Sequence, residues 1–280
     1  MEVNGNNWLC LSVFAKKSDW HFLLMVAIKP ILTLLEQKGE LISFKVCFSH
    51  FGGENIGIAL LVKRSMATRV AKEVDFLFKD FFRRHDLIPV LKEGPFESVF
   101  MPYPQNTVQY GLFSTNDYNS QLSEALSRTM IDGLAEDKID DEMLLTFSVY
   151  ILFLCYKAMM PAEVNIVEYY SACTAAVEQN IETYDLFKSK HNELNLTLRE
   201  IFNDLDQPFN KNGLHWLSHW NIAYLNALAG ATNCFEQLTL LKKTEGLLKE
   251  QLGLNDFSHG LLKYFLHQII VQTRHETQRA

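Results

Sequence analysis

The chain has 280 residues, which is enough to bury a large core in one domain or in two. Hydrophobic residues make up 48% of it, so a disordered or collagen-like chain is excluded and a globular protein is indicated. The formal net charge of −7 argues against a broad nucleic-acid-binding surface.

The first 113 residues contain patterns typical of strands. Residues 8–14 form a short apolar run, and two further apolar runs occupy 42–48 and 56–62. A turn with two glycines, residues 51–55, lies between the second and third runs. This order predicts a β-hairpin whose loop is longer than two residues.

Two helices are predicted around this hairpin. Ser18 and Asp19 supply an N-cap for the first helix, and Pro30 predicts a kink or a break within it. Ser65 caps the second helix. The prolines and the glycine between residues 89 and 104 predict an irregular or extended connection.

From Asp117 onward the spacing of apolar residues is helical almost throughout. The chain is therefore predicted to be α+β, with a small N-terminal antiparallel sheet and flanking helices packed on a larger, all-helical C-terminal part. The expected parts are 1–113 and 114–280, and we expect them to form one continuous domain because no flexible linker separates them. The predicted helices of the second part are 117–133, 140–159, 163–188, 193–204, 214–229, 233–251 and 257–275.

No targeting or membrane-spanning segment is predicted. Lys16, Lys17 and Asp19 interrupt the apolar residues near the N-terminus, which is unlike a signal peptide. The apolar run 143–156 is shorter than the roughly 20 residues needed to span a bilayer. It predicts a buried central helix.

The cysteines are widely spaced and odd in number, and no Cys-x-x-Cys pair suggests a zinc site or a disulfide framework. His215 and His219 lie one helical turn apart, but no third metal ligand is evident nearby. We therefore expect a cytoplasmic protein with reduced thiols, no metal and no cofactor. The five cysteines are Cys10, Cys47, Cys155, Cys173 and Cys234.

Two sets of side chains could form a binding surface. Strand alternation places Lys45 and Cys47 on one face of the hairpin, and Gly57 and Ala59 share a face of the second strand. The small residues leave room for a ligand or for a neighbouring helix. In the last helix, Lys263, His267 and Arg274 share one side, which either holds a carboxylate or is a solvated surface; we favour the solvated surface.

The order of these features resembles a known family. Trp8, the helix that begins at Ser18 and runs into Pro30, the hairpin, and the segment Met-Pro-Tyr-Pro-Gln-Asn-Thr-Val-Gln-Tyr-Gly at 101–111 resemble the thiopeptide-type bacteriocin biosynthesis domain. This domain is the C-terminal, glutamate-eliminating part of lantibiotic dehydratases, and it also exists as a separate small protein. The resemblance covers about residues 8 to 276 and rests on order and spacing.

The resemblance implies a lyase that removes glutamate from glutamylated Ser or Thr side chains of a precursor peptide. That chemistry needs cations for the glutamyl carboxylates and an acid–base group. Where the family pattern has arginines, this chain has Cys47, the neutral run 55–59 and Gln109. The family's late histidine corresponds roughly to Leu262, so His259 or His267 could replace it only by displacement.

On this basis three residues are catalytic candidates, and seven are candidates for substrate binding. The catalytic candidates are Lys45, His50 and His267. The substrate-binding candidates are Cys47, Gly57, Ala59, Gln109, Tyr110, Lys263 and Arg274.

The expected function is that of a divergent family member acting on a ribosomally made precursor peptide in lanthipeptide-like or thiopeptide-like biosynthesis. Two alternatives stay open: a noncatalytic peptide-binding or scaffold subunit, and a relative that forms pyridine rings by cycloaddition. Loss of the arginines leaves catalysis itself an open question. The expected partners are the precursor peptide, a separate glutamylating dehydratase subunit and a second copy of the chain, with no nucleic acid and no membrane.

Overall fold

A computed structural model describes residues 2–3, 5–87, 103–112, 121–134, 138–159, 169 and 181–277. It divides the chain into two compact units. The first is Met1–Asp140 together with Glu250–Gly253, and the second is Asp141–Lys249 together with Leu254–Ala280. The predicted α+β class is confirmed, since the first unit holds an antiparallel sheet and the described part of the second is helical. The helix predicted at 117–133 belongs to the first of these compact units. The division between the units at Asp140 therefore differs from the expected division at residue 113.

Among the described residues, the sheet of the first unit has five strands, in the order β1-β2-β4-β3, with β5 also paired to β2. Every strand pairing is antiparallel. The predicted hairpin is confirmed as β3 and β4, whose turn includes Gly52 and Gly53 at φ of 72° and 129°, values that favour glycine. The strands are β1 (Glu2–Val3), β2 (Asn6–Phe14), β3 (Leu41–Ser49), β4 (Asn55–Lys63) and β5 (Thr107–Tyr110).

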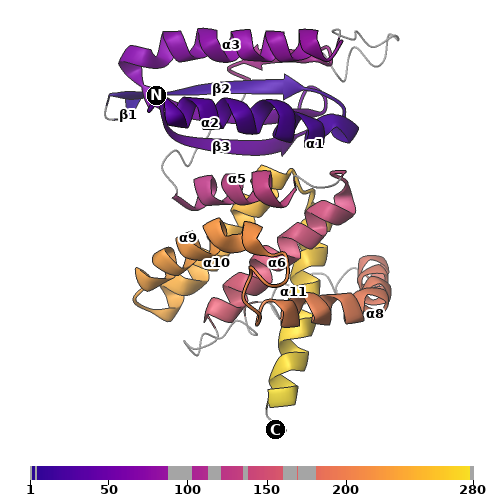
Figure 1. Cartoon of the computed structure of the whole chain (residues 1–280). Helices are drawn as coiled ribbons and strands as arrows, with labels where there is room; N and C mark the ends of the chain where they lie inside the picture. The colour runs from indigo at the N-terminus through magenta and orange to yellow at the C-terminus, as the bar shows by residue number, and fades with distance from the viewer. Residues whose placement is uncertain are drawn as a thin grey trace. The chain divides into compact units, whose positions relative to one another are not determined.

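Helices of the first unit cover the apolar face of this sheet (Figure 1). Leu11, Ile58 and Leu60 of the strands meet Ile31 of α2 and Phe78 of α3. Burial of these side chains is the main stabilising contribution, at about 25 cal/mol per Å² of apolar surface. The helical elements are η1 (Lys17–Asp19), α1 (Trp20–Leu23), η2 (Leu24–Ile28), α2 (Lys29–Gln37), η3 (Arg64–Met66), α3 (Ala67–Arg84) and α5 (Gln121–Gly133).

Neither predicted N-cap forms a side-chain capping bond. Asp19 occupies the N-cap position of α1 without such a bond, and Ser65 lies within η3, so the residue at the N-cap of α3 is Met66. At the first helix, the backbone N–H of Lys17 instead donates to Glu54 Oε2 at 2.7 Å. A carboxylate from the hairpin turn thus satisfies an amide that a local cap would otherwise satisfy. The predicted irregularity at Pro30 is confirmed, because the π-helical turn η2 ends two residues before it.

Helix α5 lies against β3, an outer strand of the sheet (Figure 1). The backbone N–H of Val46 donates to Ser127 Oγ of this helix at 2.9 Å. Ser43 Oγ and Glu124 Oε2 form a second contact at 2.7 Å. Side chains of α5 therefore satisfy polar groups that an uncovered strand edge would present to solvent.

The described part of the second unit consists of helices. Apolar residues of α6 are buried nearly all round, and Phe153 packs edge-on against Phe202 of α8 with ring centroids 5.3 Å apart. Helix α8 continues through residues 188–193, so the predicted break there is wrong. Residues 163–180 of the helix predicted at 163–188 lie outside the described residues, except for Tyr169. The elements are α6 (Asp141–Met159), α8 (Ile181–Asp204), η5 (His215–Leu217), α9 (Ser218–Ala229), α10 (Cys234–Leu252) and α11 (Asp256–Thr277).

Within the described residues, two helical stretches have the length and apolar content of a membrane span. They are Lys17–Gln37 and Asp141–Met159, and 44% and 61% of their most apolar windows are buried inside the protein. The second contains the run that the sequence predicts as a buried central helix, and its apolar side chains pack inside the second unit. A core helix passes the same test, so this similarity is weak evidence for a membrane.

Candidate functional site

One face of the sheet carries two adjacent rows of small and polar side chains, and these two rows are called here the polar face. Ser12, Gly57, Cys47 and Gln109 form one row across four strands, because each pairs with its neighbour in register. Cys10, Ala59 and Lys45 form the next row. The predicted alternation is confirmed, and five candidate residues lie on this face: Lys45, Cys47, Gly57, Ala59 and Gln109.

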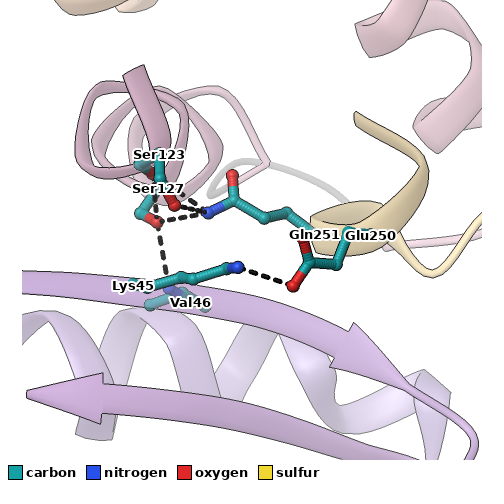
Figure 2. Close-up of polar contacts among 6 residues, drawn as sticks. All are labelled: Lys45, Val46, Ser123, Ser127, Glu250 and Gln251. Carbon is teal, nitrogen blue, oxygen red and sulfur yellow. Dashed lines mark hydrogen bonds and ion pairs between the residues drawn. The ribbon is translucent and has the colours of Figure 1, made fainter. Parts of the chain in front are cut away.

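Lys45 is the charged member of these two rows, and its charge is matched within the first unit. Its side chain is 3% exposed, and Nζ lies 2.7 Å from Glu250 Oε1 in the last turn of α10. Figure 2 shows the lysine side chain extending from β3 to meet this carboxylate. A buried ammonium group without a partner is costly, so the ion pair accounts for a lysine in this position.

Gln251 anchors the same helical turn to α5. Its side chain is fully buried, and its Nε2 donates to the carbonyl oxygen of Ser123 at 3.0 Å and to Ser123 Oγ at 2.8 Å. Ser127 Oγ donates to that carbonyl oxygen and accepts the N–H of Val46 (Figure 2). Hydrogen bonds that do not involve Glu250 therefore fix the turn that carries it.

The two thiols of the polar face are poor nucleophiles at neutral pH. Burial raises the pKa of Cys47 to about 12, although nearby Lys45 acts in the opposite direction. Burial also raises the pKa of Cys10 above its ordinary value, against the same lysine. A protonated thiol neither attacks a substrate nor ligates a metal efficiently. The two rows are therefore essentially neutral, and Ser12, Lys45, Gly57 and Ala59 within them are buried.

Two candidates of the first unit lie away from this face. His50 is exposed at the end of β3, with its ring centroid 5.7 Å from that of Trp20. Tyr110 pairs with Leu11, so it points to the opposite side of β5 from Gln109. Its pKa is raised to about 12 by burial and by the nearby Asp75. The structure thus does not bring His50 or Tyr110 into the rows that contain Lys45.

The candidates of the last helix belong to the second unit. Lys263 Nζ lies 3.1 Å from Glu245 Oε2, and the carboxylate side chain is only 3% exposed. Tyr169 donates its hydroxyl to the same oxygen at 2.8 Å. His267 is half-buried in α11, while Arg274 has a described backbone but its side chain lies outside the described residues. The charge of Lys263, like that of Lys45, is matched by a carboxylate within its own unit.

His259 titrates under the influence of this ion pair. Burial lowers its pKa below the ordinary value, and Lys263 lowers it further, while Glu245 raises it. The neutral imidazole is thus favoured in the folded state, and the stability this contributes is present above the ordinary pKa and lost as the pH falls below it. The Lys263→Met variant should shift the NMR titration midpoint of His259 upward, and Lys263→Arg should leave it low. An unchanged midpoint in Lys263→Met would remove the lysine as a cause.

Each unit also contains a hollow. One of about 620 Å³ lies between α3 and β5, with Asp75, Lys79, Asn106 and Gln109 among its lining residues. Another, of about 410 Å³, lies between α6, α8 and α11 of the second unit and is mainly apolar. Of the candidates whose side chains the structure describes, Gln109 is the one that lines either hollow. The polar face and the hollows are therefore largely separate features.

The carboxylates that neutralise Lys45 and Lys263 are not among the residues that the sequence patterns predicted to be functional. Glu250, Gln251 and Glu245 all lie on α10, and two of them occupy positions that are almost completely buried. Leu241, Leu248 and Leu252 define the apolar side of this helix. A glutamate and a glutamine among such leucines signal buried polar partners, although the pattern does not say which residues they meet.

The chain has a known α+β fold, one shared by thiopeptide pyridine synthase and by part of a lantibiotic dehydratase. The structure of TbtD, the pyridine synthase from thiomuracin biosynthesis, matches with a TM-score of 0.65 at 12% identity, over 93% of this chain and 96% of that one. TsrL matches with a TM-score of 0.62 at 10% identity, over 95% of each chain.

The third structure is the tRNA-dependent lantibiotic dehydratase MibB from Microbispora sp. 107891. It matches with a TM-score of 0.52 at 11% identity, over 98% of this chain but only 29% of the dehydratase. No protein-family model matches the chain, and no protein of curated function matches it. The resemblance seen in the sequence is thus confirmed at the level of the fold.

Proposed function

We propose that this chain acts on a ribosomally made precursor peptide in lanthipeptide-like or thiopeptide-like biosynthesis. The observation that carries the proposal is the match to TbtD along nearly the whole of both chains. A match of this extent includes both units and not just the sheet. The low identity makes the chain a divergent relative, so its reaction has to be argued from its own residues.

The polar face favours an uncharged substrate. Removal of glutamate from a glutamylated side chain requires cations that hold carboxylates, and each such contact contributes about 1.5–3 kcal/mol. Here Lys45 is already paired with Glu250, and Cys47 and Gln109 are neutral. We infer that the chain binds a peptide that has already been dehydrated, and that cycloaddition of the pyridine-forming type is favoured over elimination.

Under this proposal a separate subunit carries out glutamylation, and the protein works in the cytoplasm. The noncatalytic alternative, a subunit that binds the peptide for another enzyme, uses the same polar face. Homodimer formation is a further expectation, which sedimentation of the full chain would measure. A catalyst forms a product from the peptide and a noncatalytic subunit does not, while a homodimer is distinguished from a monomer by its mass in solution.

The proposal is tested with one precursor peptide prepared in two forms, dehydrated and glutamylated. The full chain should bind the dehydrated form. Mass spectrometry should show the loss of water that follows ring closure and the release, as an amide, of the peptide segment on the N-terminal side of the ring, the elimination that makes the ring aromatic. Binding without a product would identify a noncatalytic subunit. Release of free glutamate from the glutamylated form would contradict the inferred substrate, and failure to bind either form would contradict the proposed function.

A further inference from the structure

The ion pair on the polar face is asymmetric. The Lys45 side chain is 3% exposed, whereas that of Glu250 is 54% exposed. The ammonium group is thus enclosed, while the carboxylate reaches it from the solvent side. A carboxylate carried by a substrate would have to occupy the position of Glu250 Oε1 in order to use this cation.

Glu250 has a large advantage over such a competitor. Its tether to the chain gives it an effective concentration at Lys45 of about the millimolar range or higher. A carboxylate on a peptide at micromolar concentration therefore displaces it only if other contacts add considerable affinity. With Glu250 in place, the partly exposed members of the two rows are the neutral side chains of Cys10, Cys47 and Gln109.

The position of Glu250 does not depend on its own charge. Gln251 is held by Ser123 and Ser127, and the latter also binds the backbone of Val46 (Figure 2). The turn should therefore stay in place when the Glu250 carboxylate becomes an amide. An amide oxygen also still accepts a hydrogen bond from Lys45 without neutralising its charge.

We propose that Glu250 is the specificity-determining residue of the polar face. It neutralises Lys45, and it thereby reserves the face for uncharged segments of a peptide and rejects glutamylated side chains. This inference rests on the proposed function for its substrate class, but the competition between carboxylates at Lys45 is a property of the chain itself. It makes Glu250 the residue that separates a cycloaddition-type substrate from an elimination-type substrate.

The first experiment uses glutarate as the probe and the full chain with Glu250→Gln. Calorimetry should show glutarate binding at least tenfold more tightly to this variant than to the unaltered chain. Lys45→Met added to Glu250→Gln should abolish the gain, and Glu200→Gln, at an exposed glutamate of α8, should produce none. Equal glutarate affinity in the unaltered chain and Glu250→Gln would overturn the inference.

The second experiment repeats the comparison with the dehydrated and glutamylated peptides. Glu250→Gln should bind the glutamylated form at least tenfold more tightly than the unaltered chain does, and the dehydrated form within about twofold. Unchanged discrimination would overturn the inference while leaving the proposed function intact. If Glu250→Gln bound glutarate but neither peptide, the competition between carboxylates at Lys45 would be confirmed and the proposed function would be contradicted.

A double variant guards against loss of folding. Lys45→Met with Glu250→Leu replaces the ion pair by apolar groups of similar size, a change that is commonly tolerated. Circular dichroism should show it folded. It should bind the dehydrated peptide but not glutarate, and glutarate binding by this variant would place the carboxylate site somewhere other than Lys45.

Discussion

The Trp20→Ala variant should destabilise the first unit by about 3–5 kcal/mol, the range for deletion of a large buried aromatic side chain. Trp20 is completely buried at the start of α1, and it stacks on Phe48 of β3 with ring centroids 4.7 Å apart. Its Nε1–H also donates to the carbonyl oxygen of Ala15 at 3.3 Å. The substitution removes the indole ring, its contact with Phe48 and its hydrogen bond to Ala15.

Amide hydrogen exchange measures this loss within one unit. Protection of β4 amides should fall in Trp20→Ala, while amides of α6 in the second unit provide an internal reference. Phe76→Ala is the matched control, because Phe76 is 65% exposed and its removal should change protection little. If β4 protection in Trp20→Ala stayed within 1 kcal/mol of the unaltered chain, the tryptophan would not be a core residue.

The parts of the fold that follow from short-range patterns could be predicted from the sequence. Alternation of side chains and two glycines in the turn predict the hairpin, and apolar spacing predicts most helices. The caps could not be predicted, because the partner of the Lys17 amide is Glu54, which lies 37 positions away. The apolar spacing predicts separate helices at 163–188 and 193–204, whereas α8 continues without a break from Ile181 to Asp204.

The candidate site was predictable to the same extent. Period-two alternation predicts that Lys45 and Cys47 share one face of the first hairpin strand and that Gly57 and Ala59 share one face of the second. The structure shows in addition that the two pairs lie on the same face of the sheet. The counter-ion of Lys45 could not be predicted, because Glu250 lies 205 positions away and nothing local connects them. Side chains that determine the electrostatics of a site often come from distant parts of the chain, so periodicity gives the surface but not its charge.

Both lysines that could have replaced the missing arginines have internal partners. Lys45 pairs with Glu250 in the first unit, and Lys263 pairs with Glu245 in the second. A cation that already holds a carboxylate contributes less to binding another one, because the first must be displaced. Lys45 and Lys263 therefore do not replace the arginines that bind glutamyl carboxylates in the family pattern. This supports a substrate without free carboxylates.

The Lys263→Met variant should destabilise the second unit by about 3–5 kcal/mol, because it removes the Lys263 ammonium group from the buried Glu245 carboxylate. The Tyr169 hydroxyl still donates to that carboxylate, but a neutral donor offsets only part of the cost. Hydrogen exchange in α10 and α11 measures the loss. Lys263→Met combined with Glu245→Leu should recover most of the stability, because no charge then remains buried. A double variant no more stable than Lys263→Met would show that packing of the lysine stem, and not its charge, stabilises the unit.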